Sequence, residues 1–435
     1  MTGVVDTSSG IRARAMAVQQ YFWYLRATDP EPSSYAMQLA LAIDGPLDAA
    51  RLRRAVAATI ARHDVFRTAL REDSGALVQI VAPAAPPFEL ALADCTGTPE
   101  TAVEGAVAEL QRELDLAAGI TIRGRLLRFA PERHVLAFAI DHGVCDGASL
   151  FLLQRELFRR YERDESAAPP PPQYHEHAIA FERFGQSPEG EARTAWWRAW
   201  LAGAQPLALP FDLPRAEVDA RRAAAPHGIA AEPMHPMFVL DVPGDLRDAM
   251  TRAAAATGAS PSVLYLATHL QLLRELAGQD DICIENVYNP AVEQHGESAQ
   301  GPMSSWTIMR FELSAARTDR DVIATTRQAM QDAYEHSLIF DYFGTVPREL
   351  RGVTFNYLPA ALFNRKVTAG DVTASPLRRP FPSYKRHWHL MLFVVDSTRR
   401  GTVCMTGNQR LWQSGTIEQL ARRYVAMLER YRELA

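Results

Sequence analysis

The rest of the chain is organised around one segment, Val135-Leu136-Ala137-Phe138-Ala139-Ile140-Asp141-His142-Gly143-Val144-Cys145-Asp146-Gly147. Its apolar part, residues 135–140, has the length of a buried strand. An apolar stripe with helical spacing follows the segment and predicts an amphipathic helix; it consists of Leu150, Leu153, Leu157 and Tyr161. His142 therefore lies in a tight loop between a strand and a helix, where rigid elements on both sides can position a side chain accurately.

The chemistry of histidine makes His142 a candidate general base, because its ordinary pKa lies close to neutral pH. The spacing is equally typical of a plain turn with a hydrogen-bonded His and an Asp bonded to its own backbone. The loop residues by themselves leave both interpretations open.

The stretch from Asp141 to Gly147 resembles the His-His-x-x-x-Asp-Gly signature of condensation domains of nonribosomal peptide synthetases and of related CoA-dependent acyltransferases. The resemblance implies that His142 is catalytic and that Asp146 and Gly147 are structural. Asp141 stands where the signature has its first His. An Asp here could face His142 or accept hydrogen bonds from its own loop. We expect the second, because an active enzyme needs a neutral imidazole.

A second segment, Arg62-His63-Asp64-Val65-Phe66-Arg67-Thr68, resembles the family's Arg-His-Glu-x-Leu-Arg-Thr motif. A carboxylate beside the active-site loop is costly to bury unless it is paired, so Arg62 or Arg67 is the expected partner of Asp146. The alternative is that both arginines face solvent. Further family-like segments cover most of the remaining chain, at residues 16–25, 174–178, 196–201, 300–303 and 353–357.

The composition excludes several classes of function. A net charge of −5 and the lack of a dense Lys/Arg tract give no basis for nucleic-acid binding. No signal peptide and no run of membrane-spanning length is present, and the four cysteines form no C-x-x-C pair, so we expect a cytoplasmic protein with reduced thiols.

The pairs in His175-Glu176-His177 and His387-Trp388-His389 lack obvious further ligands, so no metal site is expected. Cys145 is expected to be a buried bystander.

The chain of 435 residues is long enough for two lobes, and the proline run 169–172 is the clearest break between them. We expect an N-terminal lobe of residues 1–168, which carries the Asp141–Gly147 motif, and a C-terminal lobe of residues 169–435. The resemblance implies an α/β fold with two chloramphenicol-acetyltransferase-like lobes in a V-shaped pseudo-dimer. His142 would lie at the floor of a channel between the lobes.

The resemblance also implies the reaction. A free-standing condensation enzyme would transfer an acyl group from the phosphopantetheine thioester of an acyl or peptidyl carrier protein, or from a CoA thioester. The acceptor would be an amine or hydroxyl on a small molecule or a second carrier, and the product an amide or ester in nonribosomal peptide or polyketide-hybrid biosynthesis. We expect a monomer without a bound cofactor. Two alternatives stay open: an epimerisation domain with Glu297 as the second acid-base group, and a non-catalytic carrier-recruitment module, which the altered first His makes conceivable.

Overall fold

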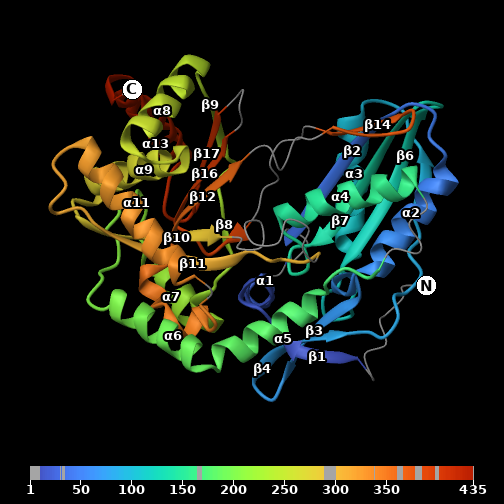
Figure 1. Cartoon of the computed structure of the whole chain (residues 1–435), viewed down its shortest axis with the longest axis horizontal. Helices are drawn as coiled ribbons and strands as arrows, with labels where there is room; N and C mark the ends of the chain where they lie inside the picture. The colour runs from blue at the N-terminus through green and yellow to red at the C-terminus, as the bar shows by residue number, and fades with distance from the viewer. Residues whose placement is uncertain are drawn as a thin grey trace.

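Two α/β lobes lie side by side and are joined along their lower part (Figure 1). The computed structural model describes residues 10–29, 31, 35–163, 169–288, 300–337, 339–359, 366–377, 385–396 and 401–434. Among these residues, no helix is long and apolar enough to cross a membrane.

The first lobe is built on a six-stranded sheet with β7 near its centre. All residues of β7 except Arg133 are buried, because helices cover both faces of the sheet and the strand is apolar in nearly every position. In spatial order the strands are β13 (Val367–Ala369), β14 (Val372–Pro376), β2 (Ala36–Asp44), β7 (Arg133–Asp141), β6 (Ile122–Ala130) and β5 (Ala91–Asp94).

Helices α2 (Ala49–Arg62) and α4 (Gly147–Glu162) pack together with one face of this sheet, and α3 (Pro99–Arg112) packs on the other. Asp146 caps α4, and the buried residues of α4 include Leu153, Leu157 and Tyr161. The predicted strand, loop and amphipathic helix around the central motif are therefore confirmed.

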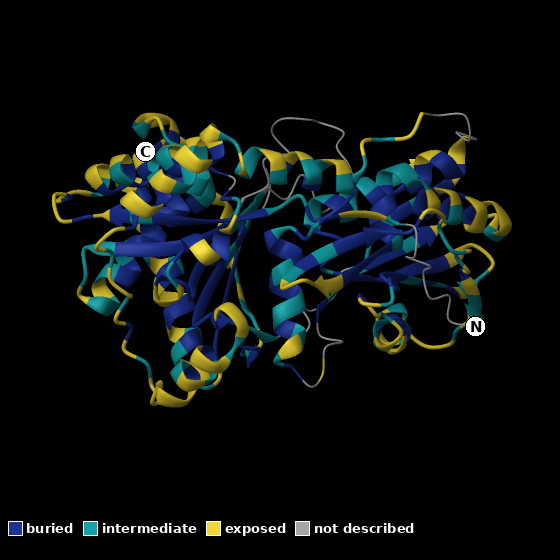
Figure 2. Ribbon diagram, turned by 90° about the horizontal axis from the view of Figure 1, so that it is seen from below, coloured by how far each residue is buried: buried dark blue, intermediate teal, exposed yellow. Residues whose placement is uncertain are grey.

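The second lobe repeats this architecture around its own six-stranded sheet. Its strands are, in order, β11 (Ser305–Glu312), β10 (Asp281–Tyr288), β12 (Val353–Pro359), β16 (Leu390–Asp396), β17 (Gly401–Gly407) and β9 (Phe238–Val242). The main helices of this lobe are α8 (Gly244–Thr257), α9 (Pro261–Ala277), α11 (Asp319–Glu335) and α13 (Ser414–Met427). Both sheets are buried and the exposed residues lie mainly on the outer helices and loops (Figure 2).

Two exchanges of chain link the lobes. Strand β14 pairs antiparallel with β2, so it lies among the blue strands of Figure 1 although it comes from the C-terminal half. Conversely, α1 (Ala17–Ala27) contributes Tyr21, Phe22 and Leu25 to the core of the second lobe. The expected division into residues 1–168 and 169–435 does not fully describe the first sheet, because β13 and β14, both from the second range, extend it beyond β2.

Shorter elements complete the fold. Helices α5 and α6 run below both lobes in Figure 1, and a small sheet of β1, β4 and β3 lies next to α5. Strands β8 and β15 form a two-stranded sheet. Their bounds, with those of the remaining short helices, are β1 (Ile11–Arg14), β3 (Thr68–Asp73), β4 (Ala76–Val81), α5 (Tyr174–Gly185), α6 (Pro188–Trp200), α7 (Ala216–Ala224), β8 (Glu232–Pro233), α12 (Tyr342–Thr345), β15 (Lys385–Arg386) and α14 (Tyr431–Leu434).

Candidate active site

His142 is the first residue after β7, and α4 begins five positions later. Its backbone N–H donates to the carbonyl oxygen of Tyr35 over 3.1 Å, and the N–H of Val144 donates to the carbonyl of Asp141 over 3.1 Å. These two bonds hold the loop in a tight turn. The backbone of His142 is therefore fixed by the first sheet, as a precisely placed side chain requires.

The imidazole of His142 lies against α1. The ring of Phe22 stacks on it, with a centroid separation of 4.2 Å and an interplanar angle of 20°. Nδ1 of His142 is buried and has no hydrogen-bond partner among the described residues. Burial, and secondly the positive charge of Arg386, lower the pKa of His142 to about 3. The ring is therefore neutral at physiological pH, and its unprotonated nitrogen can accept a hydrogen bond from a nucleophile.

The Asp141 side chain is directed to its own loop and to α1. One carboxylate oxygen accepts from the N–H of Gly143 over 2.8 Å, and the other forms an ion pair with Arg26 near the end of α1. The expectation that Asp141 bonds to the backbone of its own loop is confirmed. No pattern in the sequence predicts the ion pair with Arg26.

Asp146 ties the loop to the other lobe. Its Oδ1 accepts from the backbone N–H and the hydroxyl of Ser149 over 2.8 and 2.9 Å, so it caps α4 just before Gly147. Its Oδ2 accepts from the N–H and the hydroxyl of Ser304 over 3.0 and 2.7 Å. The hydroxyl of Ser149 also donates to the carbonyl of Gly301. The structural role implied for Asp146 thus takes the form of a bridge between lobes.

The two candidate arginine partners of Asp146 bond elsewhere. Arg67 donates from Nε to the carbonyl of Ala82 over 2.9 Å and from Nη1 to that of Ala61 over 3.1 Å, so its expected pairing with Asp146 is wrong. Nε of Arg62 lies 3.3 Å from Glu156. Glu156 is roughly 15 Å further along α4 than Asp146, at 1.5 Å per helical residue, which is why Arg62 does not serve as the predicted partner.

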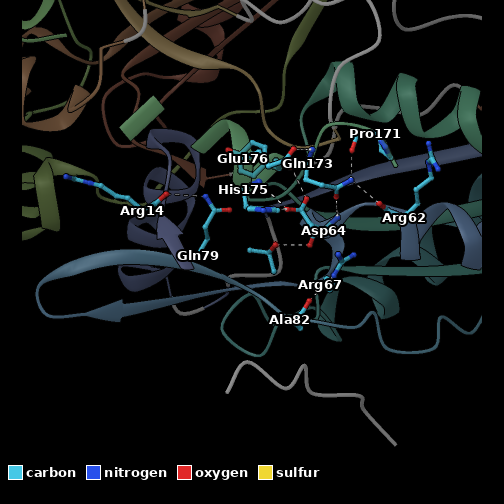
Figure 3. A network of polar contacts seen from close by, with 12 residues as sticks. Arg14, Arg62, Asp64, Arg67, Gln79, Ala82, Pro171, Gln173, His175 and Glu176 are labelled. Carbon is cyan, nitrogen blue, oxygen red and sulfur yellow. Dashed lines mark hydrogen bonds and ion pairs between the residues drawn. The ribbon is translucent and has the colours of Figure 1, made fainter. Parts of the chain in front are cut away.

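The Arg62–Thr68 motif instead anchors α5, the helix that leads into the second lobe (Figure 3). The carboxylate of Asp64 accepts from the backbone N–H groups of Tyr174 and His175 over 3.1 and 3.2 Å, and it contacts Nδ1 of His175. The N–H of Asp64 donates to the side chain of Gln173 over 2.8 Å. A carboxylate at the first turn of a helix is favourable for both hydrogen bonding and the helix dipole.

Three further candidates from the sequence are the thiol of Cys145, a metal site and Glu297. Cys145 is fully buried, and burial raises the pKa of its thiol well above the ordinary value, so it is a bystander and not a nucleophile. In the described parts of the chain, no cluster of three or more His, Cys, Asp or Glu side chains could hold a metal ion. Glu297, the second acid-base group of the epimerisation hypothesis, lies outside the described residues.

Three residues that shape the site were not found from the sequence: Phe22, Arg26 and Arg386. The first two are on α1 and the third is on β15 of the second lobe. No spacing pattern connects positions so far apart in the chain. Their proximity follows from the exchange that places α1 in the second lobe's core.

The condensation-domain family model matches residues 13–433. The chain belongs to the condensation-domain family. Chondramide synthase cmdD of Chondromyces crocatus is 30% identical over 428 residues, which cover 93% of this chain and 10% of that synthase. Phosphinothricin tripeptide synthetase PhsC of Streptomyces viridochromogenes is 27% identical over 432 residues, which cover 95% of this chain and 38% of the synthetase. The chain thus spans only a minor part of these curated relatives.

Solved structures agree with this fold. The condensation domain of the Monacolin K polyketide synthase MokA superposes with a TM-score of 0.79 at 16% identity, covering 98% of this chain and 99% of that one. SgcC5 of Streptomyces globisporus gives 0.76 at 20% identity, covering 96% and 98%. The X-domain from teicoplanin biosynthesis gives 0.77 at 20% identity, covering 100% and 97%. The predicted fold of two chloramphenicol-acetyltransferase-like lobes is confirmed.

Proposed function

We propose that this condensation-family chain transfers an acyl group from a carrier-protein thioester to an amine or hydroxyl acceptor, with His142 as the catalytic residue. The observation that carries the proposal is the neutral imidazole fixed in the loop between β7 and α4. Family membership supports the reaction class.

Acyl transfer requires the protein to assist two changes in charge. The nucleophile must lose a proton as it attacks the thioester carbonyl, and the carbonyl oxygen must be stabilised as it becomes an oxyanion. His142 supplies the first, by accepting the proton or by orienting the nucleophile. Backbone N–H groups at the start of α4, near Gly147, would assist the second, since the N-terminus of a helix favours negative charge.

The donor would arrive on the phosphopantetheine arm of an acyl or peptidyl carrier protein, with a CoA thioester as the alternative source. The acceptor would approach His142 from the opposite side of the channel proposed between the lobes. Asp146 holds both lobes through Ser149 and Ser304, so it would keep that channel's floor in place. The thioester arm is a substrate, and the reaction needs no bound cofactor.

Intact-mass spectrometry of an acyl-loaded carrier protein, with and without the chain and a panel of amine and hydroxyl acceptors, tests the proposal. We expect enzyme-dependent loss of the acyl mass from the carrier and appearance of the acylated acceptor. Inversion of a chiral acyl group without transfer, detected by hydrolysing the thioester and separating the enantiomers by chiral chromatography, would instead show an epimerase. Binding of the carrier protein without turnover of any donor would show a recruitment module. Either result would overturn acyl transfer.

A further inference from the structure

A cavity of about 310 Å³ lies in the second lobe, where the chain leaves the short helices α7 and α12. Its lining comes from the turn that follows α7, with His227 and Gly228, and from residues 343–348 together with Arg351. Small-molecule sites in proteins occupy about 300–1,000 Å³. The cavity is therefore large enough for a small ligand.

Helix α1 separates this cavity from His142. The ring of Tyr24 lies against that of His227 with a centroid distance of 4.7 Å, whereas the ring of Phe22 stacks on His142 at 4.2 Å. Side chains two positions apart on a helix point in nearly opposite directions, because each residue turns the helix by roughly 100°. The cavity is therefore a different site from the candidate active site.

Arg351 brings unused hydrogen-bond donors to this cavity. Its side chain is buried, with the residue 3% exposed, and its Nη2 donates to the carbonyl oxygen of His227 over 2.7 Å. Its Nε and Nη1 have no hydrogen-bond partner among the described residues. The hydroxyl of Thr345, which also lines the cavity, is buried and has no partner in the same part of the chain. Buried donors are ordinarily satisfied, so these groups suit acceptor oxygens brought by a ligand or by water.

Two buried guanidinium groups share one carboxylate behind the cavity. Arg222 is buried and donates to the carbonyl oxygens of Arg348 and Arg351 over 2.9 Å each. Glu285 acts electrostatically on both Arg222 and Arg351, but its ion pair in the described chain is with His387, at 3.3 Å. One carboxylate balances only one of the two buried positive charges, and an unbalanced buried charge is costly.

The exposed side of the cavity carries further charges. Arg348 is exposed, lines the cavity and adds a third guanidinium. Asp341 acts electrostatically on His227 from the start of α12, where its carboxylate accepts from the N–H of Gly344 over 3.2 Å. The group therefore has three arginines and two carboxylates, an excess of positive charge that favours an anion.

The backbone at His227 is strained. Its φ of 51° and ψ of 19° lie in the left-handed region, which residues with a Cβ atom rarely adopt. Its carbonyl oxygen is the acceptor of the bond from Arg351, so the turn and the guanidinium hold each other in place. Strained backbone of this kind is concentrated at ligand sites, which adds an independent observation to the unused donors.

We propose that this cavity is a second binding site, for a phosphate group that is either free phosphate or part of a small phosphorylated molecule. Arg351 and Thr345 donate to the phosphate oxygens from inside the lobe, and Arg348 does so from the exposed side. Two guanidinium groups and a hydroxyl suit a phosphate dianion, which offers more acceptor oxygens and more charge than a carboxylate. The site involves no chemical step and is independent of the proposed acyl transfer.

Isothermal titration calorimetry of the full chain tests the site. The probes are inorganic phosphate and adenosine 5′-monophosphate, with acetate as the carboxylate counterpart and adenosine as the uncharged one, all at one ionic strength. The variants are Arg351→Gln, Arg348→Gln and Thr345→Val. The controls are Arg422→Gln, which changes an exposed Arg on α13, and His142→Ala, which reports any binding at the candidate active site. Circular dichroism confirms that each variant is folded.

We expect the wild type, Arg422→Gln and His142→Ala to bind phosphate saturably and with equal affinity. Arg351→Gln should weaken this binding by about 10- to 100-fold, and Arg348→Gln by about 2- to 5-fold because its guanidinium is solvated. Thr345→Val should also weaken binding without lowering the stability of the free protein, since it removes a hydroxyl that has no partner. Equal affinities for the two phosphate probes would identify free phosphate as the ligand, and tighter binding of the nucleotide a phosphorylated molecule.

Three results would overturn the site: no saturable binding of either phosphate probe, acetate binding as tight as phosphate binding, or binding that only His142→Ala weakens. Arg351 also holds the turn at His227, so Arg348→Gln and Thr345→Val decide the test if Arg351→Gln does not fold. Unchanged phosphate affinity in both of these variants would then reject the proposal.

Discussion

Arg26 and Asp141 form an ion pair between the end of helix α1 and the end of strand β7, and the pair draws the Asp141 carboxylate toward α1. Asp141, which stands where the family signature has its first His, therefore has a defined partner. The pair connects the loop that carries His142 to the helix that supplies Phe22. It explains how the loop keeps its shape without the first His of the motif.

The Arg26–Asp141 pair should stabilise the folded protein. Asp141 is 1% exposed, so Asp141→Asn removes a charge that faces a partly buried guanidinium. We expect the free energy of unfolding in urea to fall by about 3 kcal/mol, as for other broken buried pairs. Arg26→Met and the double variant complete a double-mutant cycle. Additive losses would show that the two side chains do not interact in solution.

The bridge from Asp146 to Ser304 should couple the stability of the loop to the second lobe. Asp146→Ala removes four hydrogen bonds to a carboxylate, and we expect the free energy of unfolding to fall by about 2–4 kcal/mol. Ser304→Ala keeps its backbone N–H and should lose only about 1 kcal/mol. If Asp146→Ala were as stable as the wild type but inactive, the role of Asp146 would be chemical and not structural.

The pH dependence of acyl transfer should reflect the depressed pKa of His142. Its neutral form persists to about pH 3 because burial and Arg386 disfavour the imidazolium. We therefore expect no acidic limb from His142 in the turnover number between neutral pH and about pH 5, provided that the protein stays folded. An acidic limb near the ordinary histidine pKa of about 6.5 would show that water reaches the imidazole in the enzyme–substrate complex.

A second buried histidine should limit stability in acid. His269 on α9 is fully buried, and burial lowers its pKa to about 3, whereas in the unfolded chain it titrates near 6.5. Between these values the unfolded state binds the extra proton, so stability falls as the pH falls, by up to about 1.4 kcal/mol per pH unit for this one residue.

His269→Phe removes that proton-binding site while keeping a ring in the core. The free energy of unfolding in urea, measured at about pH 7 and about pH 5, should fall less for the variant than for the wild type. The difference should approach the contribution of one bound proton, about 1.4 kcal/mol per pH unit below pH 6.5. An unchanged difference between the two pH values would mean that His269 is already protonated, or hydrated, in the folded protein.

Much of this fold could be predicted from local patterns. The β7 run and the stripe Leu153, Leu157 and Tyr161 were sufficient for the strand, loop and helix that hold His142, because each element buries its own apolar residues. The turn of Asp141 onto its own loop was also predictable from the chemistry of Asp.

The long-range partners were not predictable. Arg26 pairs with the loop at Asp141, and the charge of Arg386 acts on His142, because α1 packs in the core of the second lobe and β15 comes from that lobe. Asp146 finds Ser304 and not an arginine for the same reason: hydroxyl and backbone donors from the second lobe satisfy its carboxylate. A single sequence gives no signal for contacts set by the packing of lobes.

In the proposed reaction, His142 accepts the proton of the nucleophile or orients the nucleophile. The most direct measurement is the single-turnover rate of transfer from an acyl-loaded carrier protein, for the wild type, for His142→Ala and for His134→Ala, a control at the other end of the same strand. We expect His142→Ala to fold normally and to transfer about 10²- to 10⁴-fold more slowly, with His134→Ala close to the wild type. A folded His142→Ala protein that transfers at the wild-type rate would rule out the proposed role of His142.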